Sequence, residues 1–242
     1  KGHSEDYGDF DELLFSQLLD GRDAFWKLIE NERVSIAVRM MQMLSMGHHL
    51  QKNISEGQLF GLEHIYEHYL SDGAAGRMQA YLKDRWEKPG SRYHVMKEMF
   101  ACLHKLEVLS ADWPKKVRHY EKVLFSGGRK QYEALHQYRM SDKIAEQLLS
   151  YFIYVYFAGA VYDGMPYSKV KLAVISTMLI EDMVYAKAAK KGQLSFETIA
   201  DAAHSYAREV EHSDLNLQRL SIMFRHQKCF HIGRLCGALL EW

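Results

Sequence analysis

The sequence predicts an all-α protein, and three observations support that prediction. Apolar residues recur three and four positions apart through most of the 242 residues. Only 3 prolines occur, at positions 89, 114 and 166, where a helix can begin or a loop can turn. The alternating pattern typical of strands is almost absent. We therefore expect a bundle of about ten helices, with two buried central helices in its second half.

Composition narrows the class of protein before any motif is considered. The 31 Lys and Arg residues balance 31 Asp and Glu residues, so no net charge attracts nucleic acid or anionic lipid, and we expect neither nucleic acid nor a membrane as a partner. Cys102, Cys229 and Cys236 contain no CxxC pair, which indicates a reducing compartment rather than a disulfide framework. The longest apolar run, residues 148–162, is shorter than the roughly 20 residues of a membrane-spanning helix.

The first half, residues 1–140, is predicted to be a series of amphipathic helices. The Asp20-Gly21 pair is expected to end the first helix, and Ser55-x-x-Gln58 matches a capping box that predicts the start of a third. The methionines at positions 40, 41, 43 and 46 are interpreted as core filling. The expected ranges are about 10–19, 23–50, 55 to the Gly73–Gly76 break, from there to 86, then 93–109 and 114–127.

The second half, residues 141–242, has a different character. Residues 144–157 and 170–185 are apolar on nearly every side, which is typical of helices at the centre of a fold. Apolar or small residues from Ser195 to Phe224 keep their helical spacing without a slip, which predicts one long amphipathic helix. A last helix is expected near 229–240. We expect the two halves to form one continuous helical domain of a longer protein.

Several motifs of known catalytic sites are absent from the sequence. No G-x-G-x-x-G follows a strand, and there is no P-loop, G-x-S-x-G or H-E-x-x-H. Dinucleotide, phosphate-loop, serine-hydrolase and zinc-protease functions therefore lack their residues. Motif spacing alone identifies no active site.

One group of residues has the composition of a metal site. It places two carboxylates and two imidazoles on adjacent stripes of one helix, at Glu63, His64, Glu67 and His68. Glu209-x-x-His212 adds a spacing that helical bundles use for di-iron sites. Glu209 and His212 lie off the apolar stripe of their helix, whereas such ligands must point into a bundle. A solvated polar face is the better interpretation, and a metal-binding bundle is kept as an alternative.

A second group, Arg208, Glu211 and His212, is spaced to share one outward helix face. The spacing fits an exposed charge lattice and a contact site equally well. A third group consists of tyrosines that either pack in the core or line a pocket with their phenols, and core packing is the better interpretation. Its members are Tyr151, Tyr154, Tyr156 and Tyr162.

Two segments resemble a known family. The segment EQLLSYFIYVYF at 146–157, followed by REVEHS at 208–213, is similar to the C-terminal half of the flagellin lysine-N-methylases. In that family a Glu-x-x-Leu helix with aromatic residues precedes an Arg/Ser-x-x-Glu-His signature. The resemblance covers about residues 141–224, and the first half agrees with the family only in being helical.

The resemblance implies part of an enzyme that transfers methyl groups from S-adenosylmethionine to flagellin lysines in the bacterial cytoplasm. Family members share an N-terminal cysteine-rich module that holds an iron–sulfur cluster, and this chain has no counterpart of it. The resemblance therefore implies that the catalytic cysteine-rich module lies upstream, as a partner of this domain.

The resemblance also gives Arg208, Glu211 and His212 a role, either facing the substrate or docking the upstream module. Arg208 would fix a carboxylate. Glu211 or His212 would accept a proton from the substrate ammonium, because an amine must be neutral to attack a methyl donor. The alternative is a helical interaction module without catalysis, which the balanced charge and the missing cofactor motifs favour.

Overall fold

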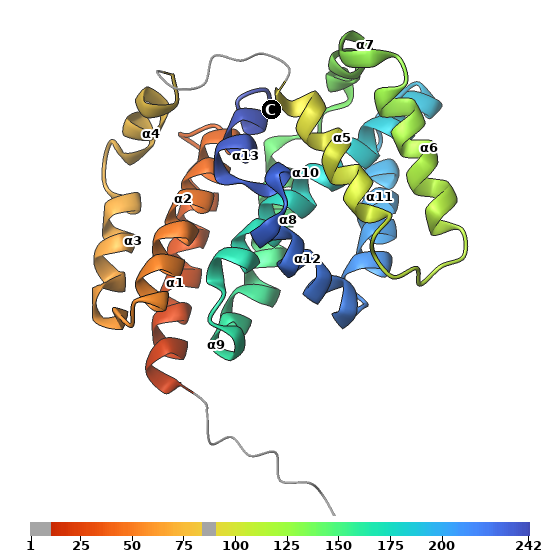
Figure 1. The fold of residues 1–242 in the computed structure, drawn as a ribbon. Helices are drawn as coiled ribbons and strands as arrows, with labels where there is room; N and C mark the ends of the chain where they lie inside the picture. The colour runs from red at the N-terminus through yellow and green to blue at the C-terminus, as the bar shows by residue number, and fades with distance from the viewer. Residues whose placement is uncertain (1–10, 84–90) are drawn as a thin grey trace, which may run out of the picture.

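The computed structural model describes residues 11–83 and 91–242, and every regular element in these two ranges is a helix, which confirms the all-α prediction. The last expected residues of the helix reaching 86 lie outside the described residues. Four short 3-10 turns are Leu59–Gly61, Leu135–Tyr138, Phe157–Gly159 and Lys228–Phe230. The α-helices, shown in Figure 1, are α1 (Glu12–Ile29), α2 (Ile36–Ser55), α3 (Leu62–Leu70), α4 (Ala74–Lys83), α5 (Ser91–Leu103), α6 (Trp113–Phe125), α7 (Gly128–Ala134), α8 (Asp142–Tyr156), α9 (Ala160–Asp163), α10 (Pro166–Lys191), α11 (Phe196–Val210), α12 (Asp214–His226) and α13 (Ile232–Leu239).

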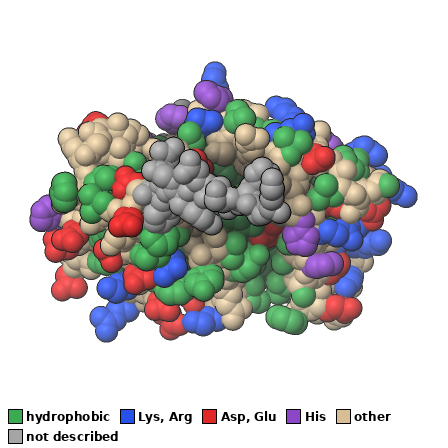
Figure 2. Space-filling model, turned by 90° about the horizontal axis from the view of Figure 1, so that it is seen from below, with side chains coloured by type: hydrophobic (Ala, Val, Ile, Leu, Met, Phe, Trp, Pro, Cys, Tyr) green, Lys and Arg blue, Asp and Glu red, His purple; other side chains and the backbone are tan. Residues whose placement is uncertain are grey.

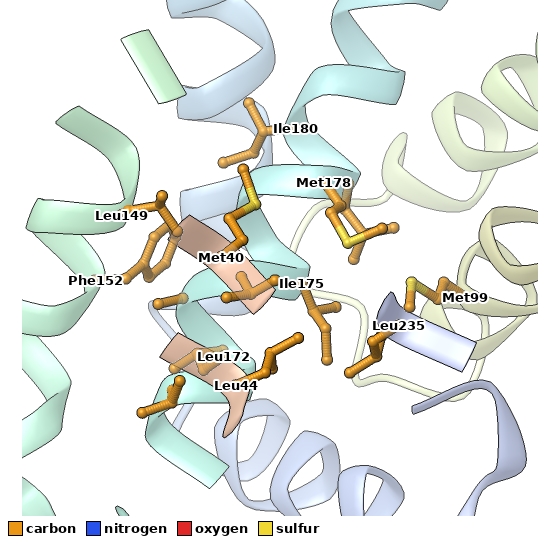
Figure 3. Close-up of a cluster of buried hydrophobic side chains, with 14 of the residues drawn as sticks. Met40, Leu44, Met99, Leu149, Phe152, Leu172, Ile175, Met178, Ile180 and Leu235 are labelled. Atoms are coloured by element: carbon orange, nitrogen blue, oxygen red, sulfur yellow. The ribbon is translucent and has the colours of Figure 1, made fainter. Parts of the chain in front are cut away.

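Helix α10 is the centre of the fold. It begins at Pro166, whose fixed φ suits a first helical turn, and ends at Lys191, before the C-cap Gly192, whose φ of 74° lies in the left-handed region. Between these ends nearly every side chain is buried, because α2, α6, α8, α11 and α12 pack around it. Figure 3 shows side chains of α10 meeting those of its neighbours. The labelled ones include Leu172, Ile175, Met178 and Ile180 of α10 with Met40, Leu44, Leu149, Phe152 and Leu235.

A single hydrophobic core joins the two halves of the chain. It runs from Leu14 to Leu239, and α2 of the first half packs directly on α10 of the second. The four clustered methionines of α2 are all buried in it, which confirms that they fill the core.

The first two expected helix boundaries are wrong. Helix α1 continues through Asp20-Gly21 and ends at Ile29. Gly21 is buried where a Cβ atom would lie 2.9 Å from the Tyr66 Oη, so this glycine permits α3 to approach α1 and does not stop the helix. Ser55 is the last residue of α2 and its Oγ donates to the Gln51 carbonyl, so it does not cap a new helix.

Helix α8 is not buried on every side, so only one of the two expected central helices is central. Its inner face includes Leu149, Phe152 and Ile153, whereas Tyr151 is 48% exposed and Tyr154 is 58% exposed. Tyrosine allows this because its ring packs on apolar neighbours while its hydroxyl can hydrogen-bond to water or to a polar side chain at the surface. The stretch Asp142–Asp163 is long and apolar enough to cross a membrane by length and composition alone, so the absence of a membrane partner stays a prediction.

The expected long helix from Ser195 to Phe224 is two helices, α11 and α12. Ser213 has an extended backbone, and its Oγ accepts a hydrogen bond from the Asn216 N–H at 3.1 Å. That contact is an N-cap, so α12 starts anew at Asp214. The Ser213 Oγ also donates to Glu107 Oε2 at 2.9 Å, which anchors the break between the two helices. The apolar stripe continues across the break although the helix does not.

Candidate functional site

The structure separates the three residues of the predicted polar group. Arg208 Nη2 lies 3.9 Å from Asp112 Oδ1, and Arg208 Nε lies 3.5 Å from Glu209 Oε1. The His212 side chain is exposed and makes no hydrogen bond or ion pair with the described residues. Glu211 instead contacts α8. The three side chains therefore share a short segment but not a single contact, and their catalytic role stays a prediction.

Glu211 is held by two tyrosines. Its Oε2 accepts a hydrogen bond from the Tyr151 hydroxyl at 2.9 Å and another from the Tyr156 hydroxyl at 3.0 Å. We call these three residues the Glu211 cluster. The segments 146–157 and 208–213, which carry the family resemblance, thus meet at one carboxylate oxygen.

A buried aromatic residue orients the two phenols. Phe152 stacks on Tyr156 at 6.2 Å between ring centroids and meets Tyr151 edge-on at 5.3 Å. On its other side it contacts Tyr206 of α11, whose hydroxyl lies 2.8 Å from the Ser176 Oγ in the core. Because Phe152 is fixed in the core, the tyrosines on either side of it are fixed too.

The electrostatics of the Glu211 cluster leave one acceptor open. Burial and the neighbouring carboxylate raise the pKa of Tyr151 to about 12 and also raise the pKa of Tyr156, so both phenols stay protonated and donate. Within the described part of the chain no cation forms an ion pair with Glu211, and its Oε1 accepts no hydrogen bond. An ionised carboxylate with a free oxygen suits a cationic donor.

Two hollows flank the Glu211 cluster. A groove of about 680 Å³ begins at Tyr156 and runs between α10 and α12. A second hollow of about 400 Å³ is bounded by Tyr151 and by Tyr154, whose ring stacks on Trp26 at 5.9 Å. The face seen from below in Figure 2 has apolar side chains exposed among charged ones. The groove that Tyr156 lines is also lined by apolar side chains, among them Leu172, Leu215 and Ile222.

Glu209 is a polar residue that the sequence interpretation placed wrongly. It is fully buried, and its Oε2 accepts hydrogen bonds from the backbone N–H groups of Leu109 at 3.2 Å and Ser110 at 3.1 Å. It therefore fastens the α5–α6 connection to α11 by satisfying backbone donors. The signal was present, because Glu209 follows the buried Tyr206 by three positions and so lies on the apolar stripe.

The metal-site alternative has no supporting geometry. Glu63, His64, Glu67 and His68 are all exposed on α3, and the one hydrogen bond among the four side chains joins His64 Nδ1 to Glu67 Oε2 at 3.4 Å. Among residues 11–83 and 91–242, no group of three or more His, Cys, Asp or Glu side chains is arranged to hold a metal ion. The four residues form a solvated face of α3.

A second cluster of carboxylates and phenol lies in the core. The Arg92 Nη2 donates to Glu181 Oε2 at 3.0 Å and to Asp182 Oδ1 at 2.9 Å, while its Nε donates to the Tyr132 hydroxyl. Tyr132 donates in turn to Asp182 Oδ2 at 2.8 Å. Burial raises the pKa of Glu181 to about 7 and also raises that of Asp182. We call these four residues the Arg92 cluster, and its cation comes from the chain itself.

The fold and the Glu211 cluster together define a helical domain with an open carboxylate on its surface. The family model for the FliB lysine N-methylase C-terminal domain matches residues 22–238. Because the match covers nearly the whole chain, the protein belongs to this family, and the resemblance seen in the sequence is confirmed. No curated protein and no solved structure matches the chain.

Proposed function

We propose that this chain is the C-terminal domain of an enzyme that transfers methyl groups from S-adenosylmethionine to lysine side chains of flagellin in the bacterial cytoplasm. Membership of the lysine N-methylase family supports the reaction class. The role that we propose for this domain is based on the Glu211 cluster. Glu211 Oε1 can accept a hydrogen bond from a cation, and no cation of the described residues pairs with it. The cation we assign to it is the ammonium of the substrate lysine.

The chemistry of lysine fits this role. Its ammonium is a compact positive charge with three donors and no acceptor. Glu211 Oε2 is already engaged by two phenols, which leaves Oε1 to accept from the ammonium. The role that we assign to Glu211 is to bind and orient the lysine. His212, exposed at the next position, stays the proposed proton acceptor.

The cofactors of the proposed reaction belong to the upstream module. The three cysteines of this chain are buried, and Cys102 donates to the Gln227 side chain at 2.9 Å. Within residues 11–83 and 91–242 no group of three or more His, Cys, Asp or Glu side chains is arranged to hold a metal ion, which supports placing the iron–sulfur cluster outside this domain. We assign the cluster and the methyl donor to the cysteine-rich module, with this domain presenting the lysine to it.

The test is the Glu211→Gln substitution in the full-length enzyme. Glutamine keeps the size and one carbonyl oxygen for the phenols but removes the charge, and a charge-assisted bond contributes about 1.5–3 kcal/mol. We expect kcat/KM for lysine methylation of flagellin, measured by mass spectrometry, to fall about 10- to 100-fold. The control is Glu197→Gln on the exposed first turn of α11, which should change nothing. Full activity of the Glu211 variant would remove this residue from lysine binding.

A further inference from the structure

The groove that begins at Tyr156 has apolar side chains at its base. Leu172 of α10 and Phe224 of α12 are buried at its base. One wall is α12, and the other is formed by Asp163 and Lys169, where α9 leads into α10. Tyr156 also donates to Glu211, so the groove opens directly beside the proposed lysine site.

The α12 wall exposes apolar side chains to the groove. Leu215 is 41% exposed and Ile222 is 46% exposed. They are seven residues apart, which is two helical turns, and therefore share one face of α12 with Gln218 and Arg225. Exposed apolar side chains that line a hollow are typical of a surface that binds another chain.

The charges at the two ends of the groove are opposite. Asp163 and Lys169 neutralise each other at 2.7 Å on the far wall. Asp214 and Arg225, which also line the groove, have no ion-pair partner among the described residues. Eleven positions of α12 separate them, which corresponds to about 16 Å along the helix axis. The end near Glu211 is therefore negative and the far end is positive.

We infer that this groove binds the polypeptide segment around the substrate lysine, and the inference rests on the proposed function. The lysine ammonium meets Glu211, apolar side chains of the segment pack against Leu215 and Ile222, and an acidic residue pairs with Arg225. Asp214 follows Glu211 by three positions, and the distance of about 16 Å from Asp214 to Arg225 corresponds to about five residues of extended chain. The preferred segment is thus a lysine, apolar residues within four positions, and Asp or Glu about five positions away.

Binding of short peptides to the full-length enzyme tests this without requiring turnover. Fluorescein-labelled peptides carry one lysine, two apolar residues and a glutamate five positions from the lysine, in both chain directions, and a matched peptide has serine in place of the apolar residues. Fluorescence anisotropy gives each Kd. We expect the apolar peptide in one of the two directions to bind at least about 10-fold more tightly than the serine peptide. Equal affinities would overturn the inference.

Two substitutions on the exposed face of α12 locate the contact. Ile222→Ser should abolish the preference for apolar residues. Arg225→Glu should weaken binding of the glutamate peptide about 10-fold. Replacing that glutamate with lysine should restore binding to this variant, a gain that misfolding cannot produce. Arg118→Glu on α6 is the matched control for the change of charge, because this exposed arginine has no ion-pair partner among the described residues.

The outcomes separate this inference from the proposed function. If Glu211→Gln weakens every lysine peptide while the α12 variants alter no preference, the groove inference fails and the role of Glu211 stands. If Glu211→Gln leaves all affinities and methylation unchanged, the proposed role of the domain fails, and the inference fails with it. If the Arg225→Glu variant binds the peptide more tightly once the peptide's glutamate is replaced by lysine, both the inference and the proposed function are supported.

Discussion

The Arg92 cluster and the Glu211 cluster use the same chemical groups in opposite settings. Each joins carboxylate to phenol, but the Arg92 cluster includes a guanidinium that pairs with both of its carboxylates. The Glu211 cluster has two phenols and no ion-pair partner within the described residues. The carboxylates of the first cluster pair with a cation of the chain itself, whereas Glu211 pairs with none among the described residues.

Burial explains why the two clusters can differ in this way. A charge in the core needs a partner because desolvation costs several kcal/mol. Glu181 and Asp182 are buried, and their partner is the guanidinium of Arg92. Glu211 is half-buried and remains partly solvated, so it tolerates the lack of a cation at small cost. Folding does not require a cation at a half-buried carboxylate beside a surface hollow. A carboxylate of this kind without an ion-pair partner therefore points to a ligand.

The largest expected effect comes from removing the cation of the buried cluster. Arg92→Met leaves two carboxyl groups buried without their partner, and breaking a buried ion pair in this way costs about 3–5 kcal/mol. Urea unfolding measures the loss. Arg129→Ala, which breaks the exposed pair with Glu133, serves as the control and should cost no more than about 0.5 kcal/mol. A loss below about 1 kcal/mol for Arg92→Met would show that the core does not depend on this charge.

The pH dependence of stability should also come from the buried cluster. Because burial raises the pKa of Glu181 from 4.5 to about 7, its contribution to stability is complete below pH 4.5 and is lost as pH rises through 7. The shift corresponds to at most about 3 kcal/mol. Asp182 shifts in the same direction. The free energy of unfolding should fall between pH 5 and pH 8 in the wild type and should fall less in Glu181→Gln. An equal fall in the two proteins would contradict the prediction.

A smaller effect is expected at the break between α11 and α12. Ser213→Ala removes the N-cap of α12 and the hydrogen bond to Glu107, at a cost of about 1–2 kcal/mol. Since Glu211 lies two residues before this cap, its hold by the tyrosines should loosen and methylation should fall with stability. Ser213→Thr, which keeps a hydroxyl for both contacts, should recover most of both. A variant that loses neither would show that Ser213 does not fix the break.

The smallest expected effect is at the phenols. Tyr151→Phe removes one of the two hydrogen bonds to Glu211 Oε2 and should cost about 0.5–1 kcal/mol of stability at most. If the phenols position the carboxylate for lysine, KM for methylation should rise a few-fold with little change in kcat. Tyr154→Phe, at an exposed position of the same helix, is the matched control. A change in kcat alone would assign Tyr151 a role in chemistry instead.

Short-range pattern predicted the helical class and the central position of α10, because a helix without a polar face can only be buried. The same rule misjudged α8, since tyrosine is compatible with a half-exposed face. Regular spacing also concealed the break at Ser213, because an apolar stripe can pass from one helix to the next. The serine followed by aspartate was the available signal for a cap.

The candidate site was only half accessible to sequence reasoning. Glu211 was singled out, but its partners Tyr151 and Tyr156 lie 60 and 55 positions away in the chain. No periodicity relates positions so distant, and their meeting depends on how α8 and α11 pack around α10. Arg208 and His212 were grouped with Glu211 by spacing. In the structure Arg208 lies near Asp112, whereas Glu211 contacts the two tyrosines of α8.

The position of Glu211 at the end of α11 has one further consequence. Glu211 is the C-cap residue of that helix, so its carboxylate lies beside the partial negative charge that the aligned peptide dipoles produce there. This repulsion opposes the last turn by about 0.3–1 kcal/mol at low ionic strength. The positive charge of a bound lysine ammonium offsets this repulsion. Ligand occupancy and the integrity of the helix end are therefore linked, and lysine peptides should raise the melting temperature, most strongly in low salt.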